Sequence, residues 1–129
     1  MGYTRYWERT DKPINPEFLA EVQSIIRTCF IKGIGLGDAF GENTPEVTLD
    51  CVAFNGSAAK GLDHESFVID NNGIGFNFCK TARKPYDYAV AKALQAAKRH
   101  GLVTSVRSDG PNKAGYSDHD YLSGNVQWD

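Results

Sequence analysis

The chain has 129 residues, of which 41% are hydrophobic and 23% are charged, as expected for one folded domain rather than a disordered or fibrous protein. Its formal net charge of −2 argues against general binding of duplex nucleic acid or of an anionic membrane surface. The first residues do not resemble a signal peptide, and no stretch approaches the roughly 18 apolar residues of a membrane span, so we expect a soluble, cytoplasmic protein.

The first predicted elements are a strand and a helix. Residues 3–9 alternate with a period near two, which is typical of a strand. Asn15 can cap a helix, a proline follows it, and apolar residues then recur every three or four positions. This pattern predicts a helix over residues 16–32, and we expect Gly33 to end it in the left-handed conformation.

A loop and a second strand follow. Residues 33–46 contain four glycines and one proline, which is typical of a long loop. The loop follows a helix and leads into none, so it matches neither a P-loop nor a dinucleotide-binding fingerprint. We interpret it as a connector, or alternatively as a flap over a ligand. Residues 47–54 alternate well enough to predict a strand.

A hairpin is predicted around Asn72 and Gly73, because Asn-Gly between two alternating apolar runs is a strong hairpin signal. Its two strands are expected over residues 65–70 and 74–80. Counting outward from the turn places three pairs of residues opposite each other, namely Ile69 with Phe76, Phe67 with Phe78, and Glu65 with Lys80.

The last predicted elements are a helix over residues 85–100 and a strand over residues 102–107. The resulting order, β-α-β-β-β-α-β, predicts an α+β fold. We expect a mostly antiparallel sheet of about five strands with both helices on one face, a variant of the ferredoxin-like fold. Residues 1–110 should form this single domain, and residues 111–129 a polar tail that docks on the domain or at a subunit interface.

The cysteines and histidines do not predict a metal or another cofactor. Cys29, Cys51 and Cys79 are widely spaced and form no C-x-x-C pair, so we expect neither a disulfide framework nor a structural zinc site. We interpret Cys79 as a small buried residue rather than as a nucleophile. His64 and His119 each stand between two acids, where neighbours on a strand point to opposite faces, so a role in solvated loops is the simpler interpretation. A composite site that joins the two histidines stays open.

The charges are unevenly distributed along the chain. Residues 1–78 hold six basic and eleven acidic side chains, residues 79–113 hold eight and two, and residues 114–129 hold none and three. The excess positive charge is therefore confined to one segment. A small anion can use such a segment, whereas a long polyanion would also meet the acidic remainder.

The basic segment crosses from a strand into a helix. Lys80, Arg83 and Lys84 bring three cations to a helix N-terminus, where free N–H groups and the helix dipole favour an anion. Thr81 adds a hydroxyl, and Tyr86 adds a ring on which a base could stack. These residue types favour a site for a phosphate-bearing ligand, and the alternative is a solvated basic turn.

Three runs of residues resemble a group of small uncharacterised proteins found on phages and other mobile elements. They are A-F-N-G at 53–56, E-S-F at 65–67 and F-C-K-T-A-R-K-P-Y-D at 78–87, and the resemblance covers residues 3–107. It implies a setting, the cytoplasm of an infected bacterium, rather than an activity. Small phage proteins of this size are similar to counter-defence factors, one class of which sequesters the nucleotide signals of bacterial immunity without chemistry.

The predicted function is non-catalytic binding of a small phosphate-bearing nucleotide, such as a cyclic nucleotide or an ADP-ribose-type immune signal. The three cations would meet the phosphates, and Trp7 would offer a second ring for stacking. Asn55 and Arg107 are expected at the rim. We expect a second subunit to complete the pocket, so the predicted protein is a homo-oligomer, and neither a membrane nor duplex nucleic acid is an expected partner.

Two other functions stay open. One is a protein-binding inhibitor of a host defence complex, because the segment 38–70 is acidic and can imitate nucleic acid or block a basic partner. The other is an enzyme of the phosphodiesterase or nuclease type that uses His64 or His119.

Overall fold

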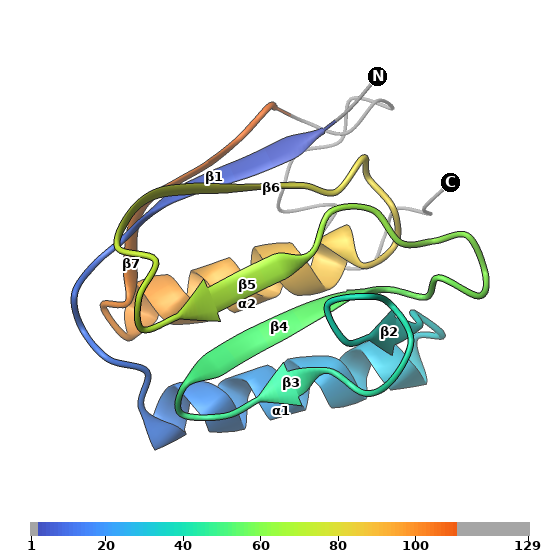
Figure 1. Cartoon of the computed structure of the whole chain (residues 1–129), viewed down its shortest axis with the longest axis horizontal. Coiled ribbons are helices and arrows are strands. Elements are labelled where there is room, and N and C mark those ends of the chain that lie inside the picture. The colour runs from blue at the N-terminus through green and yellow to red at the C-terminus, as the bar shows by residue number, and fades with distance from the viewer. Residues whose placement is uncertain (1–2, 111–129) are drawn as a thin grey trace.

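The protein is an α+β fold in which two helices cover one side of two antiparallel sheets, in the order β-α-β-β-β-β-β-α-β (Figure 1). The computed structural model describes residues 3–110. The predicted α+β class is confirmed. The predicted docking of the tail lies outside the described residues.

The helices are α1 (Pro16–Ile31) and α2 (Asp87–Arg99). The Asn15 side chain caps α1 by accepting the amide hydrogen of Phe18 at 2.8 Å, as its sequence position predicts. Gly33 follows α1 with φ +77°, and Gly101 follows α2 with φ +74°, so both glycines adopt the left-handed conformation that ends a helix. None of the helices in residues 3–110 is long and apolar enough to cross a membrane.

The first sheet has the order β6-β1-β7 and is antiparallel throughout. Its central strand is β1 (Thr4–Arg9), flanked by β6 (Gly75–Lys80) and β7 (Val103–Ser108). On β1, Tyr6 lies opposite Phe78 of β6 and opposite Arg107 of β7. Directly opposed residues in antiparallel strands face the same side, so these three side chains share one face of the sheet.

The second sheet is built around β4 (Cys51–Gly56), which pairs with three short strands. These strands are β2 (Leu36–Gly37), β3 (Glu46–Val47) and β5 (Phe67–Asp70). The strand predicted over residues 47–54 is therefore divided into β3 and β4. A turn divides it, because the Thr48 amide donates to the Cys51 carbonyl at 2.9 Å. The loop over residues 33–46 contributes the two residues of β2, so the five predicted strands become seven in two sheets.

The predicted hairpin around Asn72 and Gly73 is wrong, because β5 pairs with β4 whereas β6 pairs with β1. The two strands approach each other at one end, where the Glu65 amide donates to the Lys80 carbonyl at 3.2 Å. At the other end, Arg9 of β1 donates to the Asp70 carbonyl at 3.0 Å. A side chain thus bonds the β5 carbonyl there in place of an extended ladder between β5 and β6.

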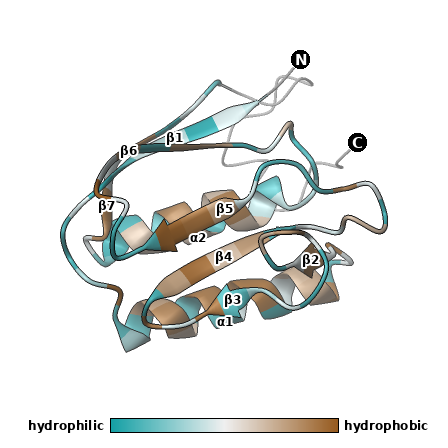
Figure 2. Ribbon diagram, in the orientation of Figure 1, coloured by the Kyte–Doolittle hydropathy of each residue, from teal (hydrophilic) through white to brown (hydrophobic). Residues whose placement is uncertain are grey.

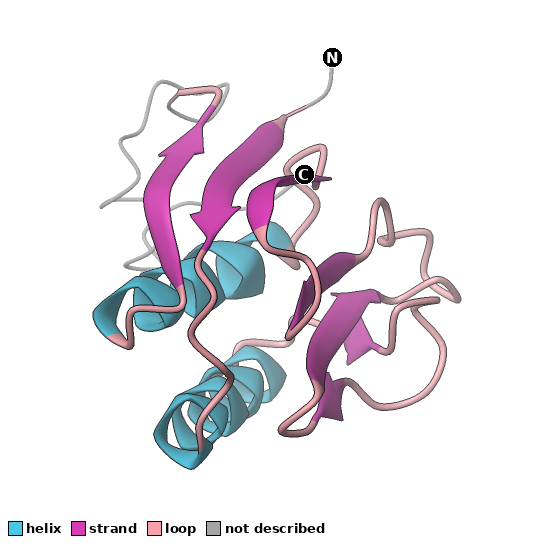
Figure 3. Ribbon diagram, turned by 60° about the vertical axis from the view of Figure 1, so that its left-hand side comes forward, coloured by secondary structure: helices cyan, strands magenta, loops and turns pink. Residues whose placement is uncertain are grey.

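The core lies between the two helices and the inner faces of both sheets. Figures 1 and 3 show α1 and α2 side by side on one side of the strands, as predicted, and Figure 2 shows that β4 and β5 are largely hydrophobic. Burial of such apolar surface stabilises the fold by about 25 cal/mol per Å². The fully buried core includes Phe18 and Val22 from α1, Val90 and Leu94 from α2, and Phe54 and Phe67 from the second sheet.

Candidate binding site

The basic turn between β6 and α2 is held by buried polar contacts. The carboxylate of Asp87, which is fully buried, accepts hydrogen bonds from two guanidinium nitrogens of Arg5 at 2.8 and 3.0 Å. The hydroxyl of Thr81 donates to the same carboxylate at 2.8 Å, and the Thr81 amide donates to the Tyr3 carbonyl at 2.9 Å. The Thr81 side chain, predicted to hydrogen-bond a phosphate, is buried and holds the turn to α2 instead.

The amides at the start of α2 also have partners within the turn. The Lys84 amide donates to the Thr81 carbonyl at 3.0 Å, and the Asp87 amide donates to the Lys84 carbonyl at 2.8 Å. The carboxylate of Asp87 lies in the first turn of α2, where it interacts with the helix dipole as a bound anion would. The geometry therefore gives no support to the predicted anion site at this helix N-terminus.

Three of the predicted site residues belong to the core. Tyr86 is fully buried, and its hydroxyl donates to the Glu65 carbonyl at 2.6 Å. Trp7 is 2% exposed, and its ring packs against Phe67 of β5, with the ring centroids 5.4 Å apart. Asn55 is 3% exposed, and its side chain both donates to the carbonyl and accepts the amide of His64, at 2.9 and 3.0 Å. None of the three presents a surface to a ligand.

The predicted cations lie nearer to the surface. The guanidinium of Arg83 stacks over the Tyr3 ring at 4.1 Å from its centroid, and both Arg83 and Lys84 are half-buried. Lys80 and Arg107 are exposed, and both point to the outer face of the first sheet. The structure therefore brings these two predicted site residues together on a surface, and separates them from Trp7, Tyr86 and Asn55.

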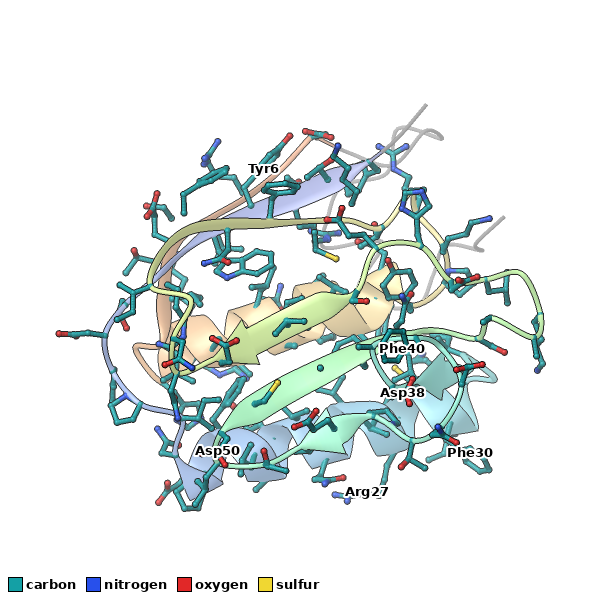
Figure 4. The ribbon with its side chains drawn as sticks, in the orientation of Figure 1. Tyr6, Arg27, Phe30, Asp38, Phe40 and Asp50 are labelled. Atoms are coloured by element: carbon teal, nitrogen blue, oxygen red, sulfur yellow. The ribbon has the colours of Figure 1, made fainter. Side chains whose placement is uncertain are left out.

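Between the two exposed cations lies a group of aromatic side chains. Phe76 and Phe78 of β6 are 55% and 46% exposed, and Tyr6 of β1 is half-buried beside them. Figure 4 shows the Tyr6 side chain at the outer edge of the molecule, away from both helices. We call the surface formed by Tyr6, Phe76, Phe78, Lys80 and Arg107 the aromatic face.

The rings of the aromatic face contact one another and the cations. The ring centroids of Tyr6 and Phe76 are 6.2 Å apart, and those of Phe76 and Phe78 are 6.0 Å apart. The guanidinium of Arg107 lies 5.2 Å from the Tyr6 centroid, and the ammonium of Lys80 lies 5.8 Å from the Phe78 centroid. Each cation is thus within the range of a cation–π interaction, which orders it at one end of the aromatic group.

Acidic side chains border the aromatic face. The Asp109 carboxylate accepts hydrogen bonds from the Tyr6 hydroxyl and the Thr4 amide, both at 2.8 Å, and the bond that Tyr6 donates to Asp109 raises the pKa of Tyr6 above its ordinary value. Tyr6 is therefore a neutral, oriented ring at physiological pH. Glu8 lies opposite Phe76 in the register of β1 and β6, and the Glu65 carboxylate accepts the amide hydrogen of Lys80 at 3.0 Å, so each of these acids disfavours an anion at its own end of the face.

Tyr6, Phe76 and Phe78 are not among the site residues predicted from the sequence. The predicted hairpin paired the two phenylalanines with Ile69 and Phe67 on one face. The sequence does contain a pattern that indicates an exposed aromatic surface here. Phe76, Phe78 and Lys80 occupy every second position of the strand, and the small residue Cys79, which suits burial, lies between the last two. This alternation puts two rings and a cation on one side of a strand.

Within the described residues, the histidines, cysteines and acids that could carry chemistry do not gather into a metal site. No group of three or more His, Cys, Asp or Glu side chains that could hold a metal ion occurs in residues 3–110. His64 contacts the Lys80 carbonyl through Nδ1 at 2.6 Å, and His119 lies outside the described residues, so a composite of the two is untested. Cys79 is fully buried, and burial raises the pKa of its thiol to about 12, which confirms its interpretation as a buried residue.

The glycine-rich loop packs closely against its surroundings. A Cβ added at Gly37 would lie 2.4 Å from the backbone of Gly41, and one added at Gly41 would lie 2.4 Å from the carbonyl oxygen of Gly56. Asp38 accepts amide hydrogens within the loop, from Phe40 at 2.9 Å and Glu42 at 3.3 Å. These contacts favour the connector over the flap.

No family model matches the chain, and no curated protein or solved structure matches it significantly. The resemblance to proteins of mobile elements therefore stays a prediction. The candidate site rests on the geometry of the aromatic face.

Proposed function

We propose that the protein binds a small phosphate-bearing nucleotide without altering it, and that the base stacks on the aromatic face. The observation that carries this proposal is the exposure of adjacent aromatic rings on one sheet, with an ordered cation at each end. Stacking of a base on an aromatic side chain contributes about 1–3 kcal/mol, and every base has a π-face that can use it. The cations would pair with phosphate oxygens.

The proposed site keeps two residues of the site predicted from the sequence, but it lies on the outer face of the first sheet rather than at the start of α2. Lys80 and Arg107 remain as phosphate-binding residues, and Arg83 and Lys84 follow Lys80 along the turn, where they extend the positive charge beyond the sheet. The resemblance to mobile-element proteins supports a cyclic nucleotide or an ADP-ribose-type signal as the ligand, bound in the cytoplasm of the host. A homo-oligomer, in which two aromatic faces share one ligand, is compatible with this proposal.

A binding measurement with a matched control tests the proposal. Phe78→Ala removes one ring of the aromatic face, and Phe30→Ala removes an 84% exposed ring of α1, which Figure 4 places on the opposite side of the molecule from Tyr6. Calorimetric titration with cyclic AMP and ADP-ribose should give binding that weakens about tenfold or more in Phe78→Ala, because one stacked base is lost. Phe30→Ala should bind as the native chain does.

The ligand recovered after denaturation should be intact, since the proposal includes no chemical step. Cleaved ligand would favour the phosphodiesterase alternative. Absence of binding to the whole panel, or equal weakening by both alanine variants, would overturn the proposal.

The protein-binding alternative has one observation in its favour. Phe40 is 76% exposed in the acidic loop, between Asp38 and Glu42, and an exposed ring among acids is a common anchor for a basic protein partner. Capture of one host protein that weakens in Phe40→Ala, and not in Phe78→Ala, would favour this function.

A further inference from the structure

We infer that the aromatic face selects a ligand with two linked nucleotides, a dinucleotide or two bases of a single strand, over a mononucleotide. This inference rests on the proposed function and adds the class of ligand. It follows from the spacing of the rings, from the placement of the two cations and from the position of Glu8 at one end of the face.

The rings are spaced for bases that are splayed apart. Phe76 and Phe78 are two residues apart on the same strand, and their centroids are 6.0 Å apart. Stacked bases repeat at about 3.4 Å, so neighbouring bases of a duplex cannot each stack on one of these rings. Proteins that recognise single strands instead stack successive unstacked bases on separate aromatic side chains. Two rings at this spacing therefore suit two bases of one flexible strand.

The two cations are placed at opposite edges of the sheet. Lys80 is on β6 and Arg107 is on β7, with β1 between them. Neighbouring strands lie about 4.8 Å apart, so the two edge strands are separated by roughly 10 Å. The ammonium of Lys80 lies over the Phe78 ring and the guanidinium of Arg107 over the Tyr6 ring, so a ligand with two phosphates can use both cations.

Glu8 limits where the phosphates can lie. It is opposite Phe76, at the end of the aromatic face farthest from Lys80, and so disfavours a phosphate there, whereas Lys80 and Arg107 favour phosphates beside Phe78 and Tyr6. The negative charge elsewhere on the chain, whose formal net charge is −2, disfavours a long polyanion. The preferred ligand is accordingly short.

Comparison of AMP, the dinucleotide pApA, an oligo(dT) of about ten nucleotides and its duplex tests the inference by fluorescence or calorimetric titration. The native chain should bind pApA at least about tenfold more tightly than AMP, because a second base is stacked. Phe76→Ala should weaken pApA binding more than AMP binding and so reduce this preference, because only one of the two β6 rings is left for stacking. Phe78→Ala should weaken the binding of both ligands. Phe30→Ala should behave as the native chain does. The single strand should bind more tightly than the duplex.

Different results would overturn the inference alone or the inference together with the proposed function. Equal affinities for AMP and pApA, both reduced in Phe78→Ala, would overturn the selection of two nucleotides and leave the proposed function intact. Failure of all four probes to bind would overturn both. If the native chain forms a dimer that dissociates in Phe76→Ala and binds none of the probes, the aromatic face is an interface between two copies.

Discussion

At the scale of single residues, the ion pair of Arg5 and Asp87 determines what the basic turn can do. Its two side chains are 4% and 1% exposed, and Thr81 completes the hydrogen bonds of the carboxylate. The guanidinium of Arg5 is buried and paired with this carboxylate, so it does not face a ligand. Thr81 and Tyr86, two of the site residues predicted from the sequence, are likewise buried parts of the fold.

Removal of Asp87 should strongly destabilise the fold. Asp87→Ala leaves the Arg5 charge buried without its carboxylate, and loss of one partner of a buried ion pair costs about 3–5 kcal/mol. Denaturation in urea should measure this loss as a fall in the free energy of unfolding. Glu21→Ala is the control, because Glu21 and Arg99 form an exposed pair that is worth about 0–1 kcal/mol. Equal losses in the two variants would contradict the structural role of Asp87.

Neutralisation of Glu8 should improve binding. Glu8→Gln removes the negative charge opposite Phe76, and the loss of this repulsion should raise the affinity for pApA roughly twofold to threefold at low salt. Glu17→Gln makes the same charge change on the exposed first turn of α1 and should leave the affinity unchanged. An equal effect of both substitutions would indicate a general charge effect rather than a site on the aromatic face.

At the scale of secondary structure, the helices could be predicted and the pairing of strands could not. The ends of α1 depend on local chemistry, which an N-cap at Asn15 and a left-handed Gly33 supply within a few residues. The partner of β6 depends instead on distant residues. The Asn-Gly signal predicts a hairpin, but Arg9 of β1 bonds the Asp70 carbonyl, and β1 itself takes the ladder of β6.

The strand pairing also bears on which predicted site residues reach the surface. Phe76 and Phe78 lie against other side chains if β6 pairs with β5, and they face solvent if β6 pairs with β1 at the edge of a separate sheet. Tyr86 and Asn55 were assigned to a surface for a similar reason, because their burial depends on the packing of segments distant in sequence. Lys80 and Arg107 could be predicted as surface residues from the sequence, because a charged side chain favours solvent wherever its strand packs.

The contact between the two helices predicts a pH dependence of stability. Burial tends to raise the pKa of Glu21, but hydrogen bonds from Arg99 and His100 outweigh this effect and lower the pKa below its ordinary value. A carboxyl with a lowered pKa in the folded state stabilises the fold above its ordinary pKa, and this contribution is lost as the pH falls through the folded value.

The free energy of unfolding of the native chain should therefore approach that of Glu21→Gln as the pH is lowered from about 7 to about 3. The difference should be small, because the pair is largely exposed. A difference that stays constant over this range, measured by denaturation at each pH, would contradict the contribution of the Glu21 carboxylate.

At the scale of the whole molecule, the distribution of charge limits the ligand more than the net charge does. The formal net charge of −2 disfavours a long polyanion, while the exposed cations of the aromatic face lie on β6 and β7, both within the basic part of the chain. Aromatic rings supply affinity that does not depend on net charge. The combination suits a short, base-containing anion that the strands β6, β1 and β7 can hold.

The central claim is that a nucleotide binds on the aromatic face, and a nuclear magnetic resonance titration of the isotope-labelled protein with pApA tests it most directly. Stacked bases shift the resonances of nearby aromatic rings, so the ring signals of Tyr6, Phe76 and Phe78 should move, together with the amides of β1, β6 and β7. The signals of Phe30 and of the loop over residues 33–46 should stay in place. Shifts confined to that loop or to the start of α2, or no shifts at all, would contradict the claim.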